Sequence, residues 1–105
     1  MDLVQRLVKP IAQEYLKAFR IVVLNGPRQS GKSTLMRAMA GTRGQIRNLD
    51  DPTELAAARN DPIGFISGNA RPLFIDEVQR GGEPLIRAVK AEVDRDPQAG
   101  KFVLA

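Results

Sequence analysis

Residues 20–34, RIVVLNGPRQSGKST, decide the fold of this 105-residue chain. The stretch opens with an apolar run rich in β-branched residues (21–24), which predicts a short buried strand. Residues 26–33 then match the pattern G-x-x-x-x-G-K-[ST] at every specified position. Residues 32–40 have the composition of a helix, which Gly41 is expected to end. A strand that runs through this pattern into a helix predicts a loop whose backbone amides hold phosphate groups.

Each specified position of the pattern has a physical reason. Gly26 and Gly31 allow a close backbone approach that a Cβ atom would block. Lys32 supplies a full positive charge at the β- and γ-phosphates, and the Ser33 hydroxyl is a suitable oxygen ligand for Mg²⁺. The alternative, a glycine-rich turn with an incidental lysine, is disfavoured by the flanking strand and helix. We therefore expect the nucleotide to be bound by Gly26, Pro27, Arg28, Gln29, Ser30, Gly31, Lys32, Ser33 and Thr34.

A second motif, LFIDE at residues 73–77, is an apolar strand that ends in two carboxylates. Asp76 suits the outer shell of a Mg²⁺ ion held near Ser33, and Glu77 suits the orientation and partial deprotonation of an attacking water. Acidic residues also cap helices or begin turns. The functional interpretation of this motif therefore rests on the phosphate-loop pattern that precedes it in the sequence. We expect Glu77 and Lys32 to be the catalytic residues. Ser33 and Asp76 are the expected metal ligands, and ATP and Mg²⁺ are the expected cofactors. Glu-Val-Gln follows Asp76 in place of a D-x-x-G switch, and no N-K-x-D occurs, which favours ATP over GTP.

Four short strand candidates alternate with three helix candidates along the chain. The strands are expected at 20–25, 45–49, 72–75 and 102–105, and the helices at 32–40, 52–60 and 83–94. This alternation predicts right-handed crossovers and a parallel sheet with helices on both faces, an α/β fold of three layers. Ligands of such sheets bind at the carboxyl ends of the strands, where both motifs fall.

Residues 1–19 carry apolar side chains at helical spacing, interrupted by Pro10, so one kinked helix or two short helices are expected. This segment either docks a partner or packs against its own domain. We therefore divide the chain into an N-terminal helical segment, 1–19, and a partial phosphate-loop core, 20–105.

The composition excludes several classes of chemistry. The chain has neither cysteine nor histidine, which excludes disulfides, thiolate or imidazole zinc sites and Ser-His triads. No apolar run is long enough to span a membrane, and the N-terminus lacks a continuous apolar signal region, so a cytoplasmic protein without membrane contact is expected.

The charges are unevenly distributed. Residues 1–47 carry nine Lys and Arg against two acids, whereas residues 48–105 carry seven against ten. A basic half could attract nucleic acid, but five aromatic residues and no Lys/Arg block make a poor stacking platform. A solvated surface is the favoured interpretation, and nucleic acid is not the expected partner.

Four further residues have two interpretations each. Asp50 and Asp51 either act near the metal and water or cap the helix that follows at Pro52. Arg28 either faces the nucleotide or a neighbouring subunit, or forms a structural ion pair. Arg80 either reaches across an interface or is a solvated side chain.

Several motifs together resemble one family. They are GPRQSGKST at 26–34, LDDP at 49–52, DP-x-G-F at 61–65, IDEVQR at 75–80 and KFVLA at 101–105. This combination is similar to the AAA-type P-loop ATPases of bacteria and archaea, whose members carry a C-terminal domain of unknown function. The resemblance implies a nucleotide site at Gly26, Gly31, Lys32 and Ser33, a Mg²⁺ role for Asp76 and a catalytic-water role for Glu77.

The resemblance covers the N-terminal part of that family. It implies that the fourth strand lies between the first and third, and that a γ-phosphate sensor, a trans-acting arginine and a fifth strand belong to the longer relatives. The fold expected is a three-layer P-loop sheet truncated at its fourth strand.

Three functions follow from these observations. The first is Mg·ATP binding with slow hydrolysis. The second is a non-catalytic nucleotide-binding or protein-interaction module that meets a protein partner or a second copy of itself. The third is nucleic-acid binding through the basic half, which a Lys32 substitution would leave largely intact.

Overall fold

The computed structural model describes residues 10–11, 19–24, 31–41, 45–97 and 101–105. The predicted N-terminal helical segment therefore lies almost wholly outside the described residues, and the division at residue 19 stays a prediction. The elements in chain order are β1 (Ile21–Val23), α2 (Lys32–Ala40), β2 (Gln45–Asn48), α3 (Pro52–Asn60), α4 (Pro62–Ser67), β3 (Leu73–Asp76), η1 (Val78–Gly81), α5 (Gly82–Arg95) and β4 (Phe102–Leu104).

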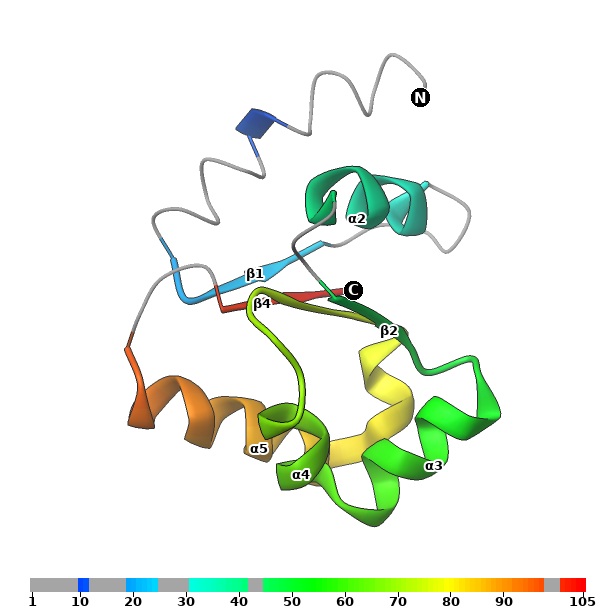
Figure 1. The fold of residues 1–105 in the computed structure, drawn as a ribbon, viewed down its shortest axis with the longest axis vertical. Helices are drawn as coiled ribbons and strands as arrows, with labels where there is room; N and C mark the ends of the chain where they lie inside the picture. The colour runs from blue at the N-terminus through cyan, green and yellow to red at the C-terminus, as the bar shows by residue number, and fades with distance from the viewer. Residues whose placement is uncertain (1–9, 12–18, 25–30, 42–44, 98–100) are drawn as a thin grey trace.

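The four strands form one parallel sheet in the order β1-β4-β3-β2 (Figure 1). β4, the last of these strands along the chain, lies between β1 and β3, with Val103 opposite Val22 on one side and Phe74 on the other. Ile46 of β2 is opposite Phe74. The central position of the fourth strand, which the family resemblance implied, is confirmed.

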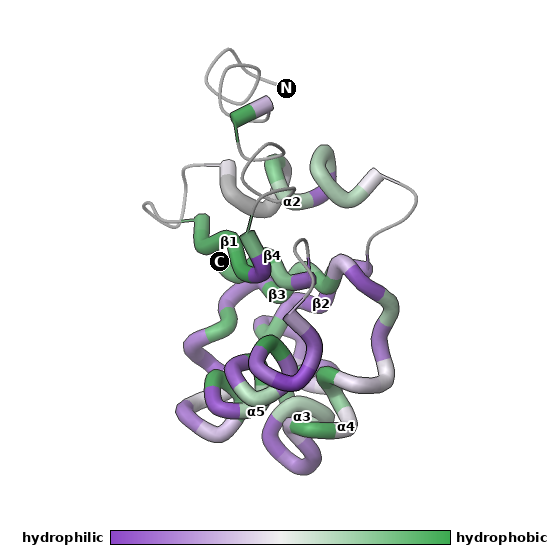
Figure 2. The backbone as a smooth tube through the Cα atoms, turned by 90° about the vertical axis from the view of Figure 1, so that its left-hand side faces the viewer, coloured by the Kyte–Doolittle hydropathy of each residue, from purple (hydrophilic) through white to green (hydrophobic). Residues whose placement is uncertain are grey.

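Helices cover both faces of the sheet and make three layers (Figure 2). On one face α2 packs its buried Leu35 and Met36 against alternate strand residues, among them Phe74 and Val103. On the other face α3, α4 and α5 cover the remaining strand residues, such as Phe102. Because β3 and β4 are buried on both faces, they consist of apolar runs rather than alternating residues. The predicted three-layer α/β fold is confirmed.

α3 begins as its sequence predicts. The Asp51 side chain accepts a hydrogen bond from the Thr53 amide (2.8 Å), and Pro52 occupies the first turn. Of the two interpretations of Asp51, the cap is therefore the one that the structure supports.

α4 is not among the helices that the sequence predicts. Asp61 does follow the end of α3, but its carboxylate also accepts from the Gly64 amide (3.0 Å) and begins the next helix. A Cβ atom at Gly64 would collide with that carboxylate. α4 then buries Phe65 and Ile66 under the sheet, and this burial stabilises a helix too short to form alone.

The other predicted elements occur with small shifts. Two helices have the predicted bounds and the third extends one residue further at each end, whereas the four strands have three or four residues each. Among the described residues, no helix combines the length and the apolar character that crossing a membrane requires.

Candidate functional site

The carboxyl ends of three strands meet at one edge of the sheet. The Leu24 amide donates to the Leu104 carbonyl (2.8 Å), and the Ala105 amide donates to the Ile75 carbonyl (2.9 Å). The chain that leaves β1 and the chain that leaves β3 are therefore separated only by β4. α2 begins on the side of the sheet towards which the strands point (Figure 1).

The start of α2 carries the second half of the predicted phosphate loop. Gly31 has a φ of 83°, a left-handed conformation that favours glycine, and its carbonyl accepts from the Leu35 amide (3.0 Å). Lys32 and Ser33 are the first two residues of α2, whose first turn holds no acidic side chain to oppose an anion. Thr34 is exposed.

The first half of that loop consists of residues 26–30. Gly26, Pro27, Arg28, Gln29 and Ser30 lie outside the described residues, as do the side chains of Lys32 and Ser33. The nucleotide-binding assignments of these residues, and both interpretations of Arg28, therefore stay predictions.

Asp76 is the last residue of β3 and is buried, with 5% of its surface exposed. Its Oδ1 accepts from the Glu77 amide (2.9 Å), and its carbonyl accepts from the Leu49 amide (3.0 Å) that follows β2. A buried carboxylate is costly unless hydrogen bonds or charges compensate it, so its position at this edge indicates more than a surface cap.

Glu77 ends the strand in an unusual conformation. Among the described residues it is the one non-glycine residue with positive φ (φ 57°, ψ 43°). This turn diverts the chain from β3 into η1, where the Val78 amide donates to the Ala105 carbonyl (2.9 Å). The Glu77 carboxylate accepts from the Gln79 side-chain amide at 2.6 Å. Neither the left-handed turn nor the role of Gln79 was predicted.

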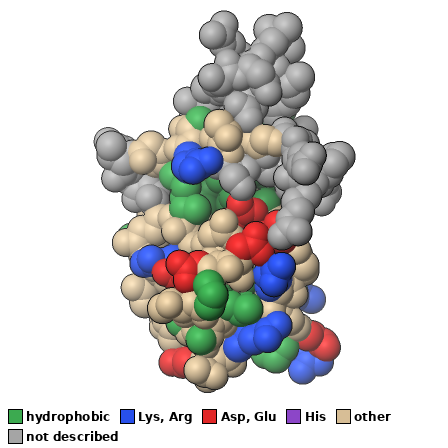
Figure 3. Space-filling view, turned by 90° about the vertical axis from the view of Figure 1, so that its right-hand side faces the viewer, with side chains coloured by type: hydrophobic (Ala, Val, Ile, Leu, Met, Phe, Trp, Pro, Cys, Tyr) green, Lys and Arg blue, Asp and Glu red, His purple; other side chains and the backbone are tan. Residues whose placement is uncertain are grey.

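An ion pair links the ends of β2 and η1. Arg80 Nε lies 2.7 Å from Asp50 Oδ1, and the Arg59 side chain of α3 donates to the Arg80 carbonyl (3.1 Å). Arg80 is therefore not simply solvated, and Asp50 contributes an ion pair where a cap or a metal-site role was considered. On the face of the molecule drawn in Figure 3, acidic side chains lie in small groups with basic side chains nearby.

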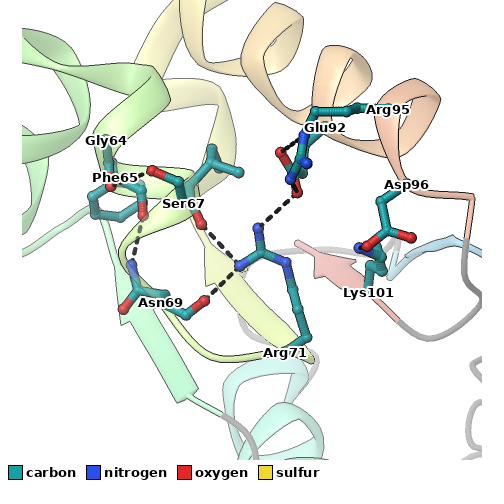
Figure 4. Close-up of polar contacts among 10 residues, drawn as sticks. Gly64, Phe65, Ser67, Asn69, Arg71, Glu92, Arg95, Asp96 and Lys101 are labelled. Carbon is teal, nitrogen blue, oxygen red and sulfur yellow. Dashed lines mark hydrogen bonds and ion pairs between the residues drawn. The ribbon is translucent and has the colours of Figure 1, made fainter.

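A separate polar cluster lies at the amino ends of β3 and β4 (Figure 4). Arg71 Nη1 donates to the carbonyls of Ile66 (2.8 Å) and Asn69 (2.6 Å), and its guanidinium carbon lies 4.8 Å from the centre of the Phe102 ring. Arg71 Nη2 is 3.5 Å from Glu92 Oε1. This cluster holds the α4–β3 connection against α5, at the end of the sheet opposite Asp76 and Glu77.

The ionisation of Glu92 is tied to its neighbours in this cluster. A hydrogen bond from Arg95 lowers the pKa of Glu92, and the positive charges of Arg95, Arg71 and Lys101 act in the same direction against the effect of burial. The same contact raises the pKa of Arg95. Lys101, itself buried, pairs with Asp96.

Comparisons with known proteins agree with this architecture. The "Uncharacterized protein Rv2008c" of Mycobacterium tuberculosis and the "Uncharacterized protein Mb2031c" of Mycobacterium bovis are each 34% identical to the chain over 88 residues. These alignments cover 80% of this chain and 19% of each relative, so the chain spans less than a fifth of their length. No solved structure matches the chain significantly. A family model described as an AAA domain matches residues 18–105, and the chain therefore belongs to the AAA domain family.

Proposed function

We propose that this chain binds Mg·ATP at the carboxyl edge of its sheet and hydrolyses it slowly. One observation carries the proposal: the buried Asp76 and the adjacent Glu77 end β3 at the edge where β1 leads towards α2. An AAA domain supports nucleotide binding in general terms. The assignment of ATP, of Mg²⁺ and of hydrolysis is the proposal itself.

The donor set fits Mg²⁺. This ion takes oxygen ligands and is commonly held by one or two carboxylates together with substrate phosphates. Asp76 offers a buried carboxylate at the strand end, and Ser33 offers a hydroxyl in the first turn of α2. When bound, Mg²⁺ would neutralise charge on the β- and γ-phosphate oxygens.

The residues of the chain would then divide the work of hydrolysis. Lys32 and the amides at the start of α2 would hold the phosphates and stabilise charge that develops in the transition state. Glu77 would orient a water molecule for in-line attack on the γ-phosphorus and accept its proton. ADP and inorganic phosphate are the products.

Slow turnover is expected of the chain by itself. An arginine supplied from a neighbouring subunit is worth about 10³–10⁵ in rate for enzymes of this kind. We propose that a second copy of the chain, or a protein partner, brings such an arginine to the carboxyl edge of the sheet. A cytoplasmic location also remains a proposal.

The primary test is a calorimetric titration of Mg·ATP into the folded chain, with Lys32→Ala as the matched variant. We expect saturable binding at one site, lost in Lys32→Ala because the phosphate charge is then uncompensated. Mg·GTP, titrated in parallel, tests the choice of base. A folded chain that binds no nucleotide would contradict the proposal, and binding without any hydrolysis would leave a nucleotide-binding module in its place.

A further inference from the structure

We infer that Gln79 is a positioning residue for Glu77, an inference that rests on the proposed function. Gln79 Nε2 lies 2.6 Å from Glu77 Oε2. An ionised carboxylate only accepts hydrogen bonds, so the amide nitrogen and not its oxygen must face it. Hydrogen bonds to a charged acceptor are shorter and roughly twice as strong as those between neutral groups. The contact therefore restrains the carboxylate of Glu77, which we propose orients the attacking water.

The backbone is shaped to make this contact. Side chains two residues apart do not face each other in a helix. Here the left-handed conformation of Glu77 breaks the regular path between β3 and η1, which brings its carboxylate beside the amide of Gln79. Conformations of this kind in non-glycine residues cluster at functional sites, where the surroundings fix them.

Gln79 belongs to η1, whose backbone is itself held by hydrogen bonds. Its carbonyl accepts from the Gly82 amide, and the Arg80 amide donates to the Glu77 carbonyl at 3.0 Å. The Arg80 side chain pairs with Asp50 at 2.7 Å, which fixes η1 to the end of β2. Because the backbone around Gln79 is held, less conformational entropy is lost when its amide binds the carboxylate.

Further contacts hold the last two residues of η1, Arg80 and Gly81. The Arg59 side chain donates to the Arg80 carbonyl at 3.1 Å, which joins η1 to α3. Gly81 is buried, and a Cβ atom there would collide with the Leu85 side chain of α5. η1 therefore packs against both neighbouring helices, and its position relative to β3 is set by the core.

The consequence is a separation of catalysis from binding. A general base works only when its oxygen lies within hydrogen-bond reach of the proton that it removes. Loss of the Gln79 amide removes one restraint on the Glu77 carboxylate, which lowers the fraction of molecules with a correctly placed oxygen. Since the amide acts through Glu77, we expect kcat to fall while KM for ATP stays unchanged.

The test compares Gln79→Met, which keeps the side-chain length but removes the donor, with the parent chain. We expect kcat to fall about tenfold, which is only part of the roughly 10²–10⁴ that positioned proton transfer contributes in full, and KM to change by less than about twofold. Gln79→Glu, which is isosteric and also lacks the amide donor, should lose at least as much. Gln45→Met makes the same chemical change at the amino end of β2 and should leave kcat unaltered.

A second pair of variants separates positioning from a structural role. In a Glu77→Gln background, Gln79→Met should lower the residual rate no further, because the group that it positions is already gone. A further tenfold loss in that background would overturn the inference, as would an unchanged kcat in Gln79→Met alone. Thermal unfolding of each variant identifies any loss that comes from the fold.

The outcomes also separate this inference from the function on which it rests. Hydrolysis that depends on Glu77 but ignores Gln79→Met would overturn the positioning role alone. Hydrolysis that is absent, or independent of Glu77, would overturn the catalytic part of the proposed function and the inference together. Mg·ATP binding lost in Gln79→Met would assign Gln79 to binding instead of positioning.

Discussion

The conformation of Glu77 is costly for a residue that carries a side chain. In the left-handed region the Cβ atom crowds the following carbonyl oxygen, at a cost of roughly 1–2 kcal/mol. The structure maintains it with hydrogen bonds of the backbone that follows, from the Val78 amide to the Ala105 carbonyl and from the Arg80 amide to the Glu77 carbonyl. This cost falls on Glu77, the residue that we propose orients the attacking water.

Two variants measure that strain. Glu77→Gly should be more stable to urea than Glu77→Ala, because both remove the carboxylate and only glycine relieves the crowding. The difference expected is about 0.5–1 kcal/mol, the strain relieved less the greater backbone entropy that glycine loses on folding. Equal stabilities, or a more stable alanine variant, would contradict the left-handed conformation.

The sequence predicts where Asp76 and Glu77 lie in the fold, but not the local conformation and contacts of Glu77. The order of apolar runs and the phosphate-loop pattern were sufficient to put Asp76 and Glu77 at the carboxyl edge. Glutamate does not favour positive φ, so its turn arises from tertiary contacts that no local pattern encodes. The pairing of Arg80 with Asp50 likewise joins residues far apart in the sequence.

At the scale of elements, the side-chain cap of α3 offers a direct test. Asp51→Ala removes the acceptor of the Thr53 amide and should lower the free energy of unfolding by about 1 kcal/mol. Asp94→Ala removes the same group from the carboxyl-terminal part of α5, where a negative charge opposes the helix dipole, and should not destabilise. Urea unfolding of both variants makes the comparison, and equal losses would argue against a capping role.

The contacts of α5 make the fold sensitive to acid. Arg95 and the neighbouring positive charges hold the pKa of Glu92 below its ordinary value of 4.5, so the native chain binds that proton less readily than the unfolded chain. The resulting stability is present above pH 4.5 and is lost as the pH falls through the native pKa. Glu92→Gln should flatten the decline of stability below pH 4.5, followed by urea unfolding at a series of pH values. An unchanged decline would show that other groups govern it.

The elements themselves were predictable to different degrees. α2 and α3 have their boundaries encoded locally, by Gly41 after one and by Asp51-Pro52 before the other. α4 has six residues, among them a proline and a glycine, and depends on the burial of Phe65 and Ile66. Helix propensity therefore says little about it, and only the packing under the sheet accounts for its presence.

At the scale of the whole molecule, the apolar cores on the two faces of the sheet meet at β4. Val103 of β4 has no exposed surface, whereas Val23 of the edge strand β1 is 55% exposed. Val103→Ala should cost about 2 kcal/mol of unfolding free energy through lost burial and the cavity that it leaves. Val23→Ala, the same change at an exposed position, should stay within about 0.5 kcal/mol. Similar costs would be inconsistent with the strand order.

The strand order also governs when the chain can finish folding during its synthesis. β1 is made first, yet its only strand neighbour among the described residues is β4, which leaves the ribosome after β2 and β3. Until β4 emerges, β1 has no hydrogen-bonded connection through the sheet to β3. The ends of β1 and β3, which would hold a nucleotide, thus come together only once β4 has been made, so a nascent chain should gain the ability to bind ligand abruptly, when β4 inserts.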